Sequence, residues 1–118
     1  MDEFKAGDRV AAFLRMAESY RAHAEYVIAR ASTTFYLPPN ISFEEGATIP
    51  LAVMTTALAL YQYLGIPPPW RPVTHGSSHP VLTYGGASAV GAFALKLAKP
   101  LNCNPIITVA GNGTLFVE

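Results

Sequence analysis

Short apolar runs separated by polar turns fill the first forty residues, a pattern typical of β-strands. Strands are predicted over residues 9–14, 24–29 and 33–37, with a polar loop over 15–21. Pro38 and Pro39 should end the third strand, because proline cannot donate a ladder hydrogen bond. The N-terminal part of the chain is therefore predicted to be all-β.

The pattern becomes helical after residue 41. Ser42 and Glu45 have the spacing of a capping box, which favours a short helix from residue 43 to about residue 48. We expect this helix to stop before Pro50, since the proline ring disfavours helical geometry in the residue before it. A largely buried helix is predicted over 51–64, with Gly65 capping its C-terminus.

A strand, a glycine-rich turn, a helix and a second strand follow in the last third of the chain. The strands are predicted over 81–84 and 105–109, and the helix is predicted to open at the glycine turn and to continue to residue 99. One helix face should pack on the sheet, because its apolar residues recur at helical spacing: Val90, Phe93, Ala94, Leu97 and Ala98. This order of elements is the βαβ unit that opens a dinucleotide-binding fold.

The turn carries a G-x-S-x-x-G motif, formed by Gly86, Ala87, Ser88, Ala89, Val90 and Gly91. Glycines let a backbone approach a pyrophosphate closely, and free N–H groups at a helix start face its negative charge. We therefore predict cofactor binding by these six residues, although the dinucleotide fingerprint has glycine in place of Ser88. The alternative is an ordinary βα turn without a ligand. A hydrolase nucleophile elbow is excluded, because it requires glycine in place of Val90.

The end of the second strand bears on cofactor preference. NAD sites typically have an acidic residue there, which binds the ribose hydroxyls. This chain has Ala110, Gly111, Asn112 and Gly113, and no carboxylate before Glu118. The segment favours NADPH, since an acidic residue would repel its extra phosphate, but it also lacks a basic residue to attract that phosphate.

Composition excludes several classes of protein. The chain has 118 residues, 51% hydrophobic and 14% charged, so it is a small folded domain and not a disordered tail. Its formal net charge is zero and it has no basic run, which argues against nucleic acid and against an anionic membrane surface. The apolar stretch 51–64 is too short to span a bilayer, and the N-terminus lacks a signal-peptide core. With a single cysteine as well, a soluble, cytoplasmic protein is expected.

Three other groups of residues are weaker candidates for chemistry. His75 and His79 are separated as zinc ligands can be, but they flank a Gly-Ser-Ser loop, so we expect solvated histidines and no metal site. Cys103 is interpreted as a packing residue, because no nearby His or Lys lowers its pKa. Polar residues on helix 51–64 indicate either a core helix or a pocket wall, and the pattern does not choose between them.

Five segments of the chain occur in the same order in the medium-chain dehydrogenase/reductase superfamily. They are GDRV at 7–10, HAEYV at 23–27, ISFEEGATIP at 41–50, TALAL at 56–60 and YGGASAVG at 84–91. The chain resembles in particular the fungal trans-acting enoyl reductases that partner polyketide synthases, and related zinc-free quinone-oxidoreductase-like enzymes. The resemblance implies an α/β fold, in which residues 1–50 are the C-terminal part of a GroES-like β-rich catalytic domain. Residues 51–118 would then start an incomplete Rossmann-type nucleotide-binding domain.

The resemblance also implies a function. Such enzymes use NADPH to reduce the α,β-double bond of a polyketide thioester held on a carrier domain of the synthase. By family pattern, residues 87–90 would bind the cofactor phosphates and residues 110–113 the adenosine 2′-phosphate. The substrate would lie beside Thr56, Ala57, Leu58, Ala59, Leu60, Tyr61, Gln62 and Tyr63. No catalytic residue is assigned.

Alternatives from the same and from other classes stay open. One is a zinc-free reductase of free quinones or enones, and another is a truncated, non-catalytic remnant that keeps a nucleotide-binding or partner-binding surface. A zinc alcohol dehydrogenase is disfavoured, because one cysteine cannot supply its usual ligands. Since the family extends beyond both ends of this chain, we expect a truncated member with uncovered sheet edges and apolar faces.

Overall fold

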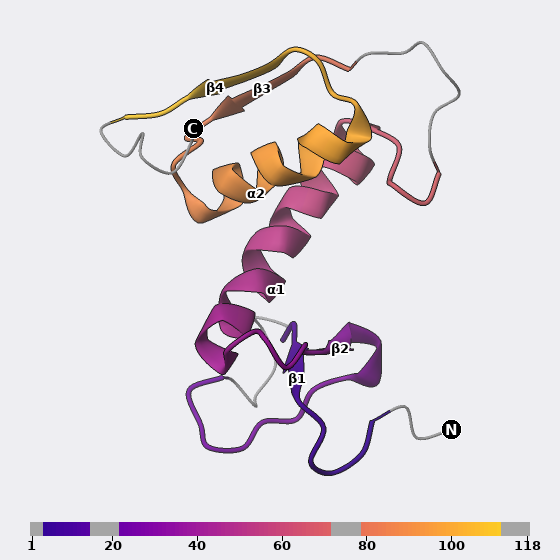
Figure 1. Cartoon of the computed structure of the whole chain (residues 1–118), viewed down its shortest axis with the longest axis vertical. Helices are drawn as coiled ribbons and strands as arrows, with labels where there is room; N and C mark the ends of the chain where they lie inside the picture. Colours follow the sequence, from indigo (N-terminus) through magenta and orange to yellow (C-terminus); the bar gives the residue numbers. More distant parts are fainter. Residues whose placement is uncertain (1–3, 15–21, 72–78, 112–118) are drawn as a thin grey trace. The chain divides into compact units, whose positions relative to one another are not determined.

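Figure 1 shows the computed structural model of the chain, which describes residues 4–14, 22–71 and 79–111. In chain order its elements are β1 (Val10–Ala12), η1 (Ala31–Thr33), β2 (Thr34–Tyr36), α1 (Phe43–Ala57), η2 (Leu58–Tyr63), β3 (Val81–Tyr84), α2 (Ala89–Ala98), η3 (Lys99–Leu101) and β4 (Ile106–Val109). The chain divides into two compact units, residues 1–51 and 52–118. Across the described ranges, no helix combines the length and the apolar character needed to cross a membrane.

The first unit contains a two-stranded antiparallel sheet. β1 pairs with β2, with Val10 opposite Tyr36 and Ala12 opposite Thr34. The strands predicted over 9–14 and 33–37 are confirmed in shorter form, but the strand predicted over 24–29 is wrong. Residues 22–30 form bends and coil, and the side chains of Tyr26 and Ile28 are 88% and 68% exposed. A strand-like sequence needs a ladder partner and a buried face, and within the described ranges this segment has neither.

Helix α1 starts as predicted but does not stop before Pro50. The capping box forms, because the Ser42 hydroxyl accepts from the Glu45 N–H at 3.1 Å and the Glu45 carboxylate accepts from the Ser42 N–H at 2.9 Å. The helix then continues through Pro50, which is buried, to Ala57. The predicted break is therefore wrong. The conformational restriction on the residue before a proline is a preference, and it is overcome here in a helix whose proline ring is packed.

The Arg9 guanidinium connects β1 to the start of α1. Its Nη1 donates to the carbonyl oxygens of Pro38 and Pro39 at 3.2 and 3.0 Å, and its Nη2 donates to that of Ile41 at 2.7 Å. The same group lies 4.6 Å from the centre of the Phe43 ring. A single planar cation with several donors thus holds the whole connection between β2 and α1.

Replacing Arg9 with alanine is expected to loosen the first unit, because three charge-assisted hydrogen bonds are lost together. We expect a loss of about 2 kcal/mol in the free energy of unfolding, since part of this interaction is solvent-exposed. Hydrogen exchange over residues 37–47 should become faster. Arg9→Lys is the matched control: it keeps the charge but not the fork of donors, and should recover only part of the protection. Exchange of the alanine variant at the parent rate would contradict this role.

The second unit contains the predicted βαβ arrangement. β3 and β4 pair in parallel, with Val81 opposite Ile106 and Tyr84 opposite Val109. Helix α2 lies along one face of this pair in Figure 1. It begins at Ala89, within the glycine turn at which the helix was predicted to open. The α/β character and the βαβ unit are confirmed, whereas their assignment to GroES-like and Rossmann domains stays a prediction.

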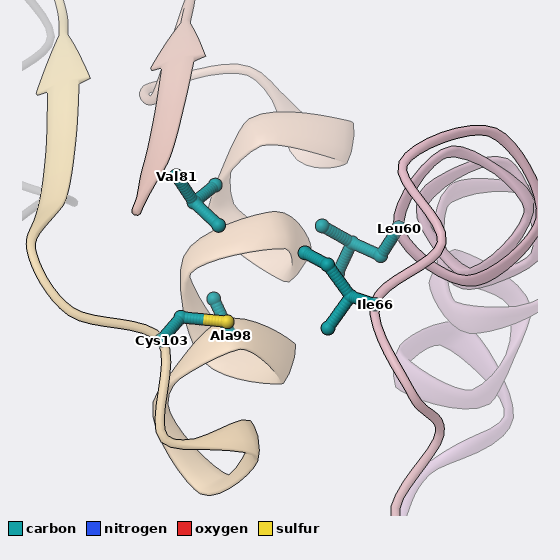
Figure 2. Close-up of a cluster of buried hydrophobic side chains, with 5 residues drawn as sticks. All are labelled: Leu60, Ile66, Val81, Ala98 and Cys103. Carbon is teal, nitrogen blue, oxygen red and sulfur yellow. The ribbon is translucent and has the colours of Figure 1, made fainter. Parts of the chain in front are cut away.

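A small apolar core holds the second unit together. Leu60, Ile66, Val81, Ala98 and Cys103 point toward one another in Figure 2, and all five are buried. Helix 51–64 was predicted to be largely buried, but most of its side chains are not. Only a stripe of residues four apart is buried there (Ala52, Thr56 and Leu60), because the core lies on one side of the helix.

No described residue covers the other face of the β3–β4 pair. Leu82 and Tyr84 are 70% and 88% exposed, and Ile107 and Val109 are 53% and 45% exposed. These side chains alternate with the ones that point toward α2, as the pleat of a strand requires. The expected uncovered apolar face is therefore present, although parallel sheets are ordinarily covered on both sides.

Candidate nucleotide-binding turn

The turn after β3 is attached to the end of β4. The backbone N–H groups of Gly85 and Gly86 both donate to the Val109 carbonyl oxygen, at 2.8 and 3.0 Å. Gly85 has φ +84°, in the left-handed region that favours glycine. The sequence motif did not include Gly85, and the paired glycines after Tyr84 are the only feature that indicates its role. The carboxyl ends of both strands thus meet at this turn.

Ser88 caps helix α2. Its hydroxyl donates to the Gly85 carbonyl oxygen at 2.7 Å and accepts from the Gly91 N–H at 3.1 Å. Both functions of the hydroxyl are therefore used inside the turn. Where the dinucleotide fingerprint has glycine, this chain has a helix cap, which explains why α2 starts directly after Ser88.

Gly86 and Gly91 lie where a side chain would collide with neighbouring atoms. A Cβ added at Gly86 would overlap the Thr108 hydroxyl, and a Cβ added at Gly91 would overlap the Gly85 carbonyl oxygen. The two glycines therefore allow the turn to pack against β4 and against the first turn of α2. Close packing of this kind is what the glycines of a dinucleotide-binding turn provide.

Three backbone N–H groups at this turn are available to a ligand. In the described part of the chain, the N–H groups of Ala87, Ala89 and Val90 donate to no acceptor. The described residues of the second unit also include no carboxylate side chain, and they carry three basic residues, Arg71, Lys96 and Lys99. Unpaired donors at a helix N-terminus, away from acidic side chains, suit an anionic group such as a pyrophosphate.

The predicted adenosine-phosphate segment begins beside the turn. Ala110 and Gly111 directly follow β4, whose last residue accepts the two turn hydrogen bonds. Asn112 and Gly113 lie outside the described residues. The structure brings the first half of this segment to the same edge as the glycine turn, and the cofactor-binding role of all ten predicted residues stays a prediction.

The predicted substrate segment contains two kinds of residue. Thr56 and Leu60 are 1% and 2% exposed, so they face the interior of the unit. Tyr63 is 81% exposed, and Ala57 and Tyr61 are half-buried. From Leu58 to Tyr63 the helix widens into π-helical geometry, a form frequent at functional sites. That these residues border a substrate stays a prediction.

Tyr61 and Cys103 titrate abnormally because of where they lie. Burial raises the pKa of the Tyr61 phenol, and the nearby Cys103 raises it further. Burial likewise raises the pKa of the Cys103 thiol. Both side chains are therefore neutral at neutral pH, and the packing role predicted for Cys103 is confirmed by its place in the core.

Of the two histidines, His79 alone lies in the described part of the chain. His75 lies outside the described residues. His79 is not solvated as predicted, because its Nε2 is buried and has no hydrogen-bond partner among the described residues. Its carbonyl oxygen accepts from the N–H of Asn104, so it packs beside the segment before β4, a neighbour that local sequence does not reveal. Within the described ranges, no group of His, Cys, Asp or Glu side chains is arranged to hold a metal ion.

Comparisons with known proteins find similarity to fungal trans-enoyl reductases. The chain is 42% identical to trans-enoyl reductase fsr4 of Gibberella fujikuroi over all of its 118 residues, which cover 35% of that protein. It is 40% identical to trans-enoyl reductase fsa3 of a Fusarium species over 111 residues, with 90% of this chain and 31% of that protein aligned. Trans-enoyl reductase phm4 of a Pyrenochaetopsis species is 36% identical, with 98% of this chain and 33% of that protein aligned.

No protein-family model matches the chain. The relatives nevertheless agree with the resemblance that the sequence motifs indicated, and the chain spans about a third of their length. Over the third of their length that it aligns with, this chain is a relative of the fungal trans-enoyl reductases.

Proposed function

We propose that the chain is part of an NADPH-dependent enoyl reductase that acts on α,β-unsaturated polyketide thioesters presented by a synthase carrier domain. The observation that carries this proposal is the glycine turn between β3 and α2, with its three unpaired N–H groups, in a chain related to trans-enoyl reductases. The relatives supply the reaction class through their names, and the turn supplies the chemistry for holding an anionic cofactor.

In this proposal the residues of the turn act by binding and orienting the cofactor. The N–H groups of Ala87, Ala89 and Val90 would face the pyrophosphate, while Gly86 and Gly91 leave room for its close approach. NADPH would supply the hydride for the double bond. Ala110, Gly111, Asn112 and Gly113 would hold the adenosine end, where the absence of an acidic residue favours NADPH over NADH.

The substrate would lie beside the segment from Thr56 to Tyr63. Two observations support this part of the proposal. The π-helical geometry of η2 covers six of the eight predicted residues, and several of their side chains remain open to solvent, among them Leu58 at 44% and Tyr63 at 81%. An apolar and aromatic surface of this kind suits the hydrocarbon chain of a polyketide.

Ser88→Asp and Ser88→Asn form a matched pair that tests the turn. Aspartate and asparagine both cap helices well, so each variant should keep the hydrogen bond from the Gly91 N–H, while both lose the hydroxyl that donates to the Gly85 carbonyl oxygen. Only aspartate adds a negative charge beside the proposed pyrophosphate. We expect about 100-fold weaker NADPH binding for aspartate, from charge repulsion of roughly 3 kcal/mol near the protein surface. Asparagine should bind nearly as tightly as the parent.

The measurement is a fluorescence titration of the whole chain with NADPH, with NADH titrated in parallel. Tighter binding of NADPH than of NADH would support the proposed preference. Equal NADPH affinities of the aspartate variant and the parent would show that the phosphates bind elsewhere.

A further inference from the structure

The Thr56 side chain lies in the last turns of α1, which belong to the second unit, and it is buried against the start of α2. It is 1% exposed, although a threonine hydroxyl is polar. The hydroxyl oxygen lies 2.9 Å from the Ala52 carbonyl oxygen and 3.0 Å from the Val90 carbonyl oxygen. A buried polar group is retained at little cost only where it is hydrogen-bonded, and here both neighbours are backbone acceptors.

The two acceptors differ in what they connect. Ala52 lies in α1, one turn before Thr56, so that hydrogen bond stays within a single helix. Val90 is the second residue of α2, 34 positions further along the chain. A hydroxyl has one proton, which it donates to either carbonyl or shares between them. The contact with Val90 is the one that restrains a second element.

Val90 belongs to the turn of backbone that carries the unpaired donors. Its carbonyl oxygen faces Thr56, while its own N–H and that of Ala89 have no acceptor in the described residues. On its other side, this first turn of α2 is held by the Ser88 cap and by the close contact of Gly91 with Gly85. Thr56 thus completes the set of contacts that fix the start of α2.

We propose that Thr56 is a positioning residue for the cofactor site: its hydroxyl holds the first turn of α2 so that the N–H groups of the turn keep the orientation that a pyrophosphate needs. This inference rests on the proposed function for the cofactor itself. In this inference Thr56 acts by holding the first turn of α2 in place, and it does not need to touch a substrate.

Thr56→Val and Thr56→Ser separate positioning from packing. Valine keeps the shape of threonine and removes the hydroxyl, while serine keeps the hydroxyl. In the whole chain, we expect valine to weaken NADPH binding about fivefold to tenfold, roughly the net value of one buried hydrogen bond. Serine should restore most of the affinity. Ile66→Ala is the control, because it removes a core side chain that is 4% exposed and should lower stability without weakening NADPH binding by the folded chain.

Hydrogen exchange of the nucleotide-free chain gives a second readout that does not depend on NADPH. In the valine variant, the amides of Ala92, Phe93 and Ala94 should exchange faster than in the parent, while those near Ala98 should not change. If the parent binds no NADPH, the proposed function fails and the exchange comparison alone decides the role of Thr56. Parent-like exchange at the start of α2, or parent-like NADPH affinity in the valine variant, would overturn the inference.

Discussion

Gly91→Val is expected to abolish nucleotide binding and to destabilise the second unit strongly. A side chain at this position would overlap the Gly85 carbonyl oxygen, and its Cβ would come within 2.9 Å of the Gly86 Cα. These are backbone atoms of a turn that is itself hydrogen-bonded to the end of β4. Because they cannot rotate away, the turn must move. We expect a loss of about 3 kcal/mol in the free energy of unfolding, at the upper end for an overpacked site.

Gly111→Val is the matched control for this change. A Cβ added at Gly111 meets no atom of the described residues within 4 Å, so the same substitution there should leave the denaturation midpoint close to that of the parent. Chemical denaturation of the two variants and the parent measures the difference. If the two valine variants unfold at the same denaturant concentration, the close packing of Gly91 against the turn is not a source of stability.

Leu60→Ala is expected to have the next largest effect. Leu60 is 2% exposed and lies in the core cluster with Ile66, Val81, Ala98 and Cys103 (Figure 2). Its truncation removes buried methyl groups and leaves a cavity, at a cost of about 3 kcal/mol. Leu64→Ala is the control, because Leu64 is 63% exposed and should contribute little.

Cys103 reports on this change directly. Its thiol is buried and its pKa is raised, so it should react slowly with thiol reagents at neutral pH in the folded chain. We expect Leu60→Ala to accelerate labelling of Cys103 markedly and Leu64→Ala to leave its rate unchanged. Equal labelling rates in the two variants would show that Leu60 does not hold this core together.

Interactions between residues close in sequence could be predicted without the structure. The capping box of Ser42 and Glu45 forms as its spacing indicates. The glycine turn lies between two parallel strands, as the order of apolar runs predicted. The partners in the capping box are three residues apart, so the local pattern contains that whole interaction. The parallel pairing joins residues 25 positions apart, such as Val81 and Ile106, and was predicted from the order of the elements.

The predictions that were wrong depended on distant partners. The apolar residues around Tyr26 resemble a strand, yet they stay exposed and have no ladder partner in the part of the chain that the structure describes. Pro50 suggested a helix end, but it is packed in the middle of α1. The burial of the His79 ring nitrogen and the Thr56 hydroxyl likewise depends on tertiary neighbours. Single-residue preferences are weak where tertiary packing opposes them.

In the candidate site too, the local motif could be predicted from the sequence, whereas contacts with distant residues could not. The motif from Gly86 to Gly91 was visible in the sequence, because glycines and a helix start follow an apolar strand. The roles of Gly85, Val109 and Thr56 were not, because each depends on a hydrogen bond or a backbone angle of the folded chain. The sequence therefore identified the turn that we propose binds the cofactor, while the contacts that hold this turn in place required the structure.

Amide chemical shifts recorded by NMR during titration of the whole chain with NADPH would test the central claim most directly. The account predicts saturable shifts that are largest for the N–H groups of Ala87, Ala89 and Val90, with smaller ones at Gly111. Shifts confined to other parts of the chain would contradict the assignment of the turn. A folded chain whose amides do not respond to NADPH would contradict the cofactor site itself and favour a non-catalytic role.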